Sequence, residues 1–84
     1  MSKRIWRYTI PNGHVYRRWA ELDPAKGLWS AREVYGKVGD DGTFKATSLA
    51  WLPDGPFCST QEQVEAVLEA MGAETGWTEE APDA

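Results

Sequence analysis

The segment STQEQVEAVLEAMG, residues 59–72, constrains the fold more than any other part of the chain. Ser59 stands where a helix N-cap is expected, and Glu62 follows three residues later, which is the spacing of a capping box. Gly72 is the expected C-cap, because glycine can take a left-handed conformation without steric cost. The apolar residues between these ends recur at helical spacing: Val64, Val67, Leu68 and Met71. The sequence therefore predicts an amphipathic helix, and a helix this short needs a surface on which to bury its apolar stripe.

The chain before this helix predicts a sheet. Four segments are rich in β-forming residues or alternate in polarity, namely 4–10, 14–22, 28–38 and 43–52. Short turn signals, rich in Gly, Pro, Asn and Asp, separate them. Because parallel strands need long crossovers, short turns between neighbouring strands indicate an antiparallel meander. We expect an α+β fold with two layers, a four-stranded antiparallel meander packed against one C-terminal amphipathic helix.

The register of the first hairpin is ambiguous in the sequence. A two-residue Asn12-Gly13 turn pairs Trp6 with Trp19, whereas a three-residue turn that includes Pro11 pairs Trp6 with Arg18. A slip of one residue exchanges the two faces of a strand. The sequence alone therefore does not say which aromatic side chains of the hairpin are inside.

The length of 84 residues indicates one small domain. We assign residues 1–72 to this α+β domain. The remaining segment, AETGWTEEAPDA, is acidic and contains Trp77 as its only large apolar residue. We therefore expect residues 73–84 to form an acidic flexible tail.

The composition excludes several classes of protein. Cys58 is the only cysteine, so no intrachain disulfide can form, and His14 is the only histidine. Cys58 and His14 would together supply a nucleophile and a base, but a small cysteine buried under the helix is the simpler interpretation. No phosphate-binding or calcium-binding loop is present. We expect no enzymatic activity, no cofactor and no metal.

The sequence shows neither a signal peptide nor a membrane-spanning segment, and this indicates a cellular location. The N-terminal segment MSKRIWRY has basic residues without a following apolar stretch, unlike a signal peptide. No apolar run is long enough to cross a bilayer. We expect a cytoplasmic protein that does not associate with membranes.

Charge is distributed unevenly along the chain. Residues 1–38 carry eight basic and three acidic side chains, whereas residues 39–84 carry one basic and ten acidic side chains. The basic half interleaves arginines with aromatic rings, and the candidate binding residues there are Arg7, Tyr16, Arg17, Arg18, Trp19 and Arg32. Trp, Tyr and Arg are enriched at protein–protein hot spots. Rings and cations on a sheet also bind single-stranded nucleic acid. A third interpretation points the rings inward and leaves the arginines as solvated charges.

The acidic half offers a second candidate surface. Glu62, Glu65 and Glu69 are expected on the helix face opposite the apolar stripe, and Trp77 is expected to dock on a partner or on the domain. We predict a small non-enzymatic module that binds another protein as a regulator or inhibitor, a description that accessory proteins of phages and mobile elements fit. The alternative is a single-stranded nucleic-acid-binding protein that uses the basic hairpin. Edge strands of the sheet also offer a route to a homodimer.

Overall fold

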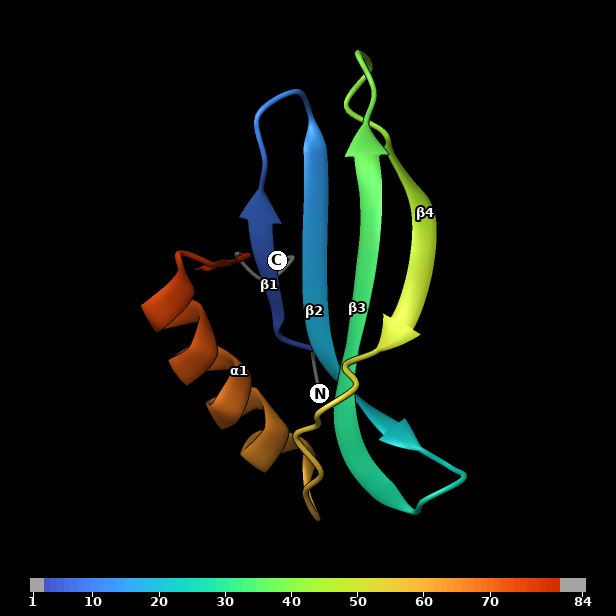
Figure 1. Cartoon of the computed structure of the whole chain (residues 1–84), viewed down its shortest axis with the longest axis vertical. Coiled ribbons are helices and arrows are strands. Elements are labelled where there is room, and N and C mark those ends of the chain that lie inside the picture. Colours follow the sequence, from blue (N-terminus) through green and yellow to red (C-terminus); the bar gives the residue numbers. More distant parts are fainter. Residues whose placement is uncertain (1–2, 81–84) are drawn as a thin grey trace.

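The computed structural model describes residues 3–80 (Figure 1). Within that range the elements are β1 (Ile5–Thr9), β2 (His14–Asp23), β3 (Leu28–Val38), β4 (Phe44–Trp51), α1 (Gln61–Thr75) and β5 (Thr78–Glu79). They form one antiparallel sheet in the order β4-β3-β2-β1-β5. The predicted α+β fold is confirmed, with four meander strands and one C-terminal helix packed against them, and a short fifth strand is added. No helix among residues 3–80 is long and apolar enough to cross a membrane.

The first hairpin has the three-residue turn. Trp6 pairs with Arg18, and the backbone N–H of Ile10 donates to the carbonyl oxygen of His14 at 2.9 Å, which closes the turn around residues 11–13. Asn12 has a φ of 79°, a left-handed conformation that asparagine adopts more readily than most residues. The register therefore places Trp6 on one face of the sheet and Trp19 on the other.

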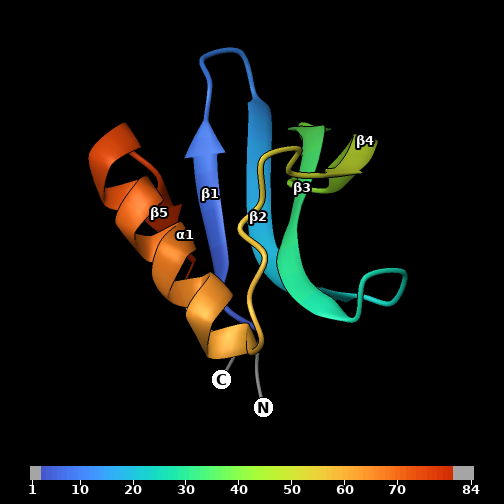
Figure 2. The same ribbon diagram turned by 60° about the horizontal axis from the view of Figure 1, so that its bottom comes forward.

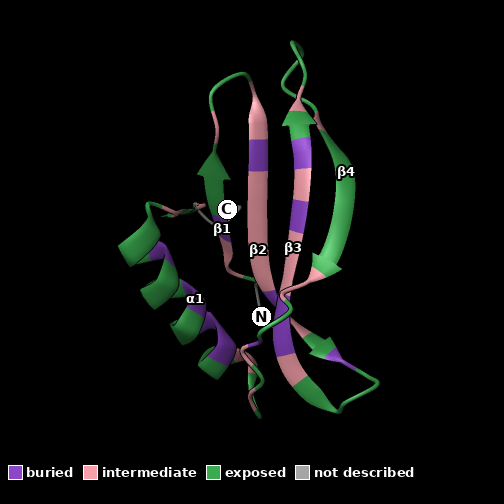
Figure 3. Cartoon of the chain, viewed as in Figure 1, coloured by how far each residue is buried: buried purple, intermediate pink, exposed green. Residues whose placement is uncertain are grey.

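Helix α1 covers the face that carries Trp6. Figures 1 and 2 show the helix near β1 and β2, with β4 at the opposite edge of the sheet. The buried cluster between the two layers consists of Trp6, Ala20, Ala31, Val64 and Leu68. Four partly buried residues pack against this cluster: Trp29, Leu52, Cys58 and Trp77. Figure 3 shows the buried residues of α1 as a stripe on the side that faces the sheet.

The helix caps lie at other residues than predicted. Thr60 is the N-cap: its hydroxyl accepts from the backbone N–H of Gln63, and the Gln63 side-chain oxygen accepts from the N–H groups of Ser59 and Thr60. A glutamine thus completes the capping box, in place of the predicted Ser59–Glu62 pair. The C-cap is Gly76, with a φ of 83°. The helix begins and ends later than predicted.

Gly72 lies inside the helix because of packing. A Cβ atom at this position would lie 3.1 Å from the Cβ of Trp77 and 3.4 Å from Cδ1 of Trp6. The missing side chain therefore lets the indole of Trp6 and the Cβ of Trp77 approach the helix backbone. Gly72 is a contact residue of the core and not the predicted helix terminus.

The predicted apolar stripe of α1 is half correct. Val64 and Leu68 are buried, whereas Val67 and Met71 are 37% and 36% exposed. Glu65, predicted on the solvent face, is only 6% exposed. Its carboxylate accepts from the backbone N–H of Arg4 at 3.2 Å and from the side-chain amide of Gln61 at 3.1 Å. These hydrogen bonds satisfy the buried carboxylate and draw this side of the helix toward the start of β1.

The chain after Gly72 differs from the predicted tail. Residues 73–75 continue α1, Trp77 packs against the core, and β5 pairs with β1 through Trp6↔Glu79 and Arg7↔Thr78. The N–H of Glu80 donates to the carbonyl oxygen of Ile5 at 2.8 Å. The domain therefore extends at least to residue 80, and the rest of the predicted tail, 81–84, lies outside the described residues.

Candidate protein-binding surface

The candidate surface is the face of the sheet that points away from α1, which we call the open face. Strand register arranges its side chains in rows across β1, β2, β3 and β4. The first row is Ile5, Trp19, Arg32 and Trp51, and the second is Arg7, Arg17, Val34 and Leu49. Antiparallel partners point to the same side of a sheet, so each row presents one continuous strip of side chains. No helix among residues 3–80 covers these rows.

In the first row Arg32 stands between two rings, and Lys3, which precedes β1, adds a second cation. The Nζ of Lys3 lies 4.6 Å from the ring centroid of Trp19, and the guanidinium of Arg32 lies 4.2 Å from that of Trp51. Both distances are within the range of a cation–π interaction. The tryptophans are half-buried because the cations of the same chain lie against them.

Glu21 connects Trp19 to Arg32 in this row. Its carboxylate accepts from the indole N–H of Trp19 at 3.0 Å and from Nε of Arg32 at 3.2 Å. The hydrogen bond from Trp19, reinforced by Arg32, holds the pKa of Glu21 below its ordinary value. Glu21 therefore stays ionised at neutral pH and fixes the orientation of both neighbours.

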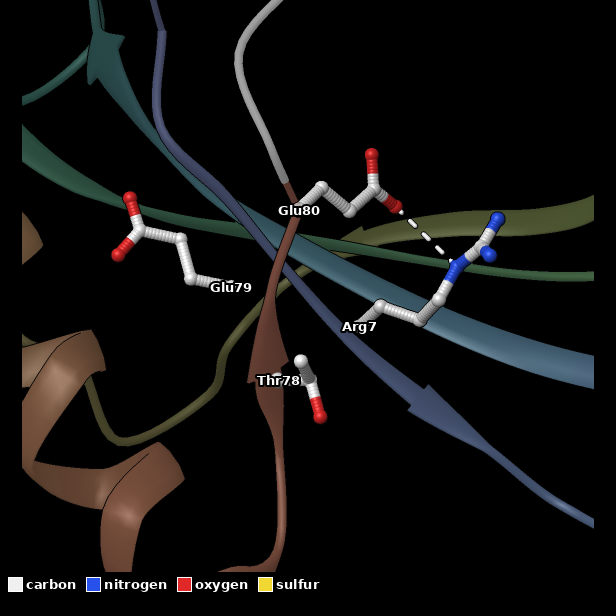
Figure 4. Close-up of a pocket in the computed structure, with 4 residues that line it drawn as sticks. All are labelled: Arg7, Thr78, Glu79 and Glu80. Atoms are coloured by element: carbon white, nitrogen blue, oxygen red, sulfur yellow. Dashed lines mark ion pairs between the residues drawn. The ribbon is translucent and has the colours of Figure 1, made fainter.

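Glu80 has the same role in the second row. Its carboxylate accepts two hydrogen bonds of 2.9 Å from Arg17 and forms an ion pair of 3.2 Å with Arg7. Figure 4 shows Glu80 directed toward Arg7, while Glu79 leaves β5 toward the other side. Together with Thr78 these residues line a hollow of about 360 Å³. Glu80, the last described residue, thus holds Arg7 and Arg17 in place, and both arginines are among the predicted binding residues.

Phe44 closes the end of the open face near the β3–β4 turn. A Cβ atom at Gly36 would lie 2.6 Å from Cζ of Phe44, so the ring lies directly over this glycine. The guanidinium of Arg17 lies 5.6 Å from the Phe44 centroid. Val15, the strand partner of Gly36, is 2% exposed although no described helix covers it. Long side chains thus replace a second layer at this end of the sheet.

The predicted binding residues fall on both sides of the sheet. Arg7, Arg17, Trp19 and Arg32 lie together on the open face, whereas Tyr16, Arg18 and Trp77 lie on the helix side. There Arg18 lies 4.0 Å from the Trp77 centroid and forms an ion pair of 2.7 Å with Glu33. Tyr8, Tyr16, Arg18, Glu33, Thr75 and Trp77 line a shallow hollow of about 390 Å³.

The acidic residues predicted on the helix do not form one free surface. Glu62 is exposed, Glu65 is buried, and Glu69 forms an ion pair with Arg4. Arg4 also donates to both carboxylate oxygens of Glu79, at 2.7 and 2.8 Å. Arg4 thus joins the helix to β5, so part of the predicted acidic surface is used within the fold.

Protonation of Glu79 should weaken the attachment of β5 to β1. The hydrogen bond from Arg4 lowers the pKa of Glu79. The ionised carboxylate therefore stabilises β5 above the unfolded pKa of about 4.3, and this stabilisation is lost as the pH falls through the lower folded value. We expect hydrogen-exchange protection of the Glu80 amide to drop between pH 6 and pH 3. In Glu79→Gln the protection should be low at both pH values, and equal protection of the wild type at both would contradict the role of this ion pair.

The two residues considered for nucleophilic chemistry lie at opposite ends of β3. Cys58 pairs with Trp29, whereas His14 pairs with Lys37. Eight residues of strand separate these positions, which corresponds to roughly 26 Å. The Cys58–His14 pair does not form. Among residues 3–80 no group of three or more His, Cys, Asp or Glu side chains is placed to hold a metal ion.

Sequence reasoning missed several residues of the open face: Glu21, Phe44, Leu49, Trp51 and Glu80. Alternation along the fourth strand puts Leu49 and Trp51 on one face, but it does not say whether that face also carries Trp19. Only the pairing registers of β2 with β3 and of β3 with β4 show that Leu49, Trp51 and Trp19 share a face. Comparisons with protein families, curated proteins and solved structures find no match to this chain.

Proposed function

We propose that this chain is a small, non-enzymatic cytoplasmic module that regulates or inhibits a partner protein, and that it contacts this partner through the open face. The main support for this proposal is the row of Trp19, Arg32 and Trp51. Glu21 accepts hydrogen bonds from the first two of these side chains. Trp and Arg are the residues most enriched at hot spots of protein interfaces. Their arrangement on a face that no helix among residues 3–80 covers supports a role in binding.

The internal contacts of this face favour binding. Arg32 is held by Glu21 and Trp51, and Arg17 is held by Glu80. Side chains that are already ordered lose less conformational entropy when a partner binds. Leu49, which is 53% exposed, adds apolar area beside this ordered row.

The charge of the face indicates the chemistry of the partner. Four cations, Lys3, Arg7, Arg17 and Arg32, accompany two carboxylates, Glu21 and Glu80. The surplus of positive charge complements an acidic surface. We therefore expect a partner protein with an apolar patch bordered by acidic side chains.

Single-stranded nucleic acid is the alternative ligand for the same face. Bases stack on free aromatic faces. Here Lys3 lies over Trp19, and Arg32 lies over Trp51. A base would have to displace these cations, and this favours the protein ligand.

The experiment compares Arg32→Ala with Lys37→Ala in capture of the partner from nuclease-treated native lysate, followed by affinity measurement on the purified pair. Both substitutions remove one positive charge from β3, and Lys37 lies on the opposite face because an odd number of positions separates it from Arg32 along the strand. A hot-spot arginine contributes about 2 kcal/mol or more, so we expect Arg32→Ala to weaken binding about 30-fold. Lys37→Ala should bind as the wild type does.

Two results would contradict the proposal. The first is equal affinity of both variants, especially if Glu62→Lys abolishes binding, because the contact would then lie on the helix. The second is retained material that disappears with nuclease and an affinity for oligonucleotides that falls steeply with salt, which would identify nucleic acid as the ligand.

A further inference from the structure

Strand β4 is an edge that the described residues leave unpaired. It ends the strand order, and its outer side has no neighbouring strand within residues 3–80. Exposed edges are commonly protected by charges, prolines, β-bulges or short length, and β4 has one bulge, at its middle. β4 has eight residues, no proline and Lys45 as its only charged residue. Figure 3 shows most of β4 as exposed. Such an edge is a template for pairing with another strand.

The side chains of β4 on the open face follow from its register with β3. Every second residue of β3 from Arg32 to Val38 points to the open face, and their partners on β4 are Trp51, Leu49, Ala46 and Phe44. A register shift between Tyr35 and Gly36 inserts one additional residue into β4. Ala46 and Leu49 therefore share a face although an odd number of positions separates them. Four apolar side chains line this side of the edge strand.

We propose that β4 pairs with β4 of a second copy of this chain, antiparallel, around a two-fold axis between Thr47 and Ser48. The four apolar residues are placed symmetrically about this axis. Phe44 then lies opposite Trp51 of the second copy, and Ala46 lies opposite its Leu49. Lys45 lies opposite Ala50, so no like charges meet. The strand is thus complementary to itself in one register, because positions of the same face lie opposite each other.

The size of the contact defines the kind of dimer. A contact along one eight-residue edge buries less accessible surface than stable complexes do, for which about 1,200–2,000 Å² is typical. The dimer therefore dissociates on dilution. In the paired state the open faces of the two copies form one continuous surface. Self-association adds to the proposed binding function and does not depend on it.

The test measures mass by analytical ultracentrifugation over a dilution series. For the wild type we expect the average mass to rise with concentration from 9.4 kDa toward twice that value. Ala46→Lys combined with Leu49→Lys places lysine opposite lysine at two points of the dimer. Both positions are exposed in the single chain. We expect dimerisation to weaken at least 10-fold while the circular dichroism spectrum is unchanged.

The matched control is Ala46→Glu combined with Leu49→Lys. In the proposed register each glutamate faces a lysine of the second copy, so this variant should dimerise at least as well as the wild type. A wild type that stays monomeric at every concentration overturns the proposal. So does equal behaviour of the two variants, and so does a monomer that binds an extended peptide along β4. Each result is independent of the effect of Arg32→Ala on partner binding.

Discussion

Replacing Trp6 with alanine should remove about 3–5 kcal/mol from the free energy of unfolding. Trp6 is 3% exposed and lies at the centre of the cluster between the sheet and Leu68 of α1. The cavity left by an indole group cannot collapse easily, because Trp77 and the backbone at Gly72 already pack closely beside it. Small domains are stable by only about 5–15 kcal/mol, so this single change removes a large share of the total.

The measurement is urea denaturation followed by circular dichroism, with Trp51→Ala as the control. Trp51 is also an indole on the same sheet, but it lies on the open face and is only partly buried. We expect Trp51→Ala to cost clearly less stability than Trp6→Ala. If Trp51→Ala costs more, then the assignment of the two faces is wrong, and the proposed binding surface would instead be part of the core.

The sequence predicted the order and type of the main elements because turn chemistry and helical periodicity are local signals. It did not determine which of two registers the first hairpin adopts, since both are compatible with the turn residues Pro11, Asn12 and Gly13. That register decides whether Arg17 or Arg18 shares a face with Trp6. The candidate arginines therefore could not be separated into two faces before the structure was known.

The misplaced parts of the helix and the tail have a different cause. The periodicity of α1 indicates which positions are apolar, but it does not indicate which groups from other parts of the chain contact each position. Glu65 is buried because the backbone N–H of Arg4, distant in sequence, reaches its carboxylate. β5 is two residues long and is held by β1 and by arginine partners of Glu79 and Glu80. No local signal predicts a strand whose stabilising partners lie more than 60 residues away.

Replacing Gly36 with alanine should destabilise the β3–β4 pair strongly. The φ angle of Gly36 is not positive, so close contact and not backbone strain is the reason. An added Cβ atom would lie 2.6 and 2.9 Å from ring atoms of Phe44 and would also clash with the carbonyl oxygen of Lys45. A backbone oxygen in a ladder cannot move without breaking the pairing of its strand. Overpacking of this kind costs about 1–3 kcal/mol, and the rigid neighbour indicates the upper end.

Thermal unfolding and hydrogen exchange of β4 amides would measure this effect, with Gly42→Ala as the control. Gly42 has a φ of 82° and open space around its Cα, so its substitution tests backbone strain without a clash. We expect that cost to be about 1 kcal/mol, without selective loss of protection in β4. A stable Gly36→Ala protein would mean that Phe44 does not lie over Gly36. The ring would then not cover this end of the open face, and the burial of Val15 would need another explanation.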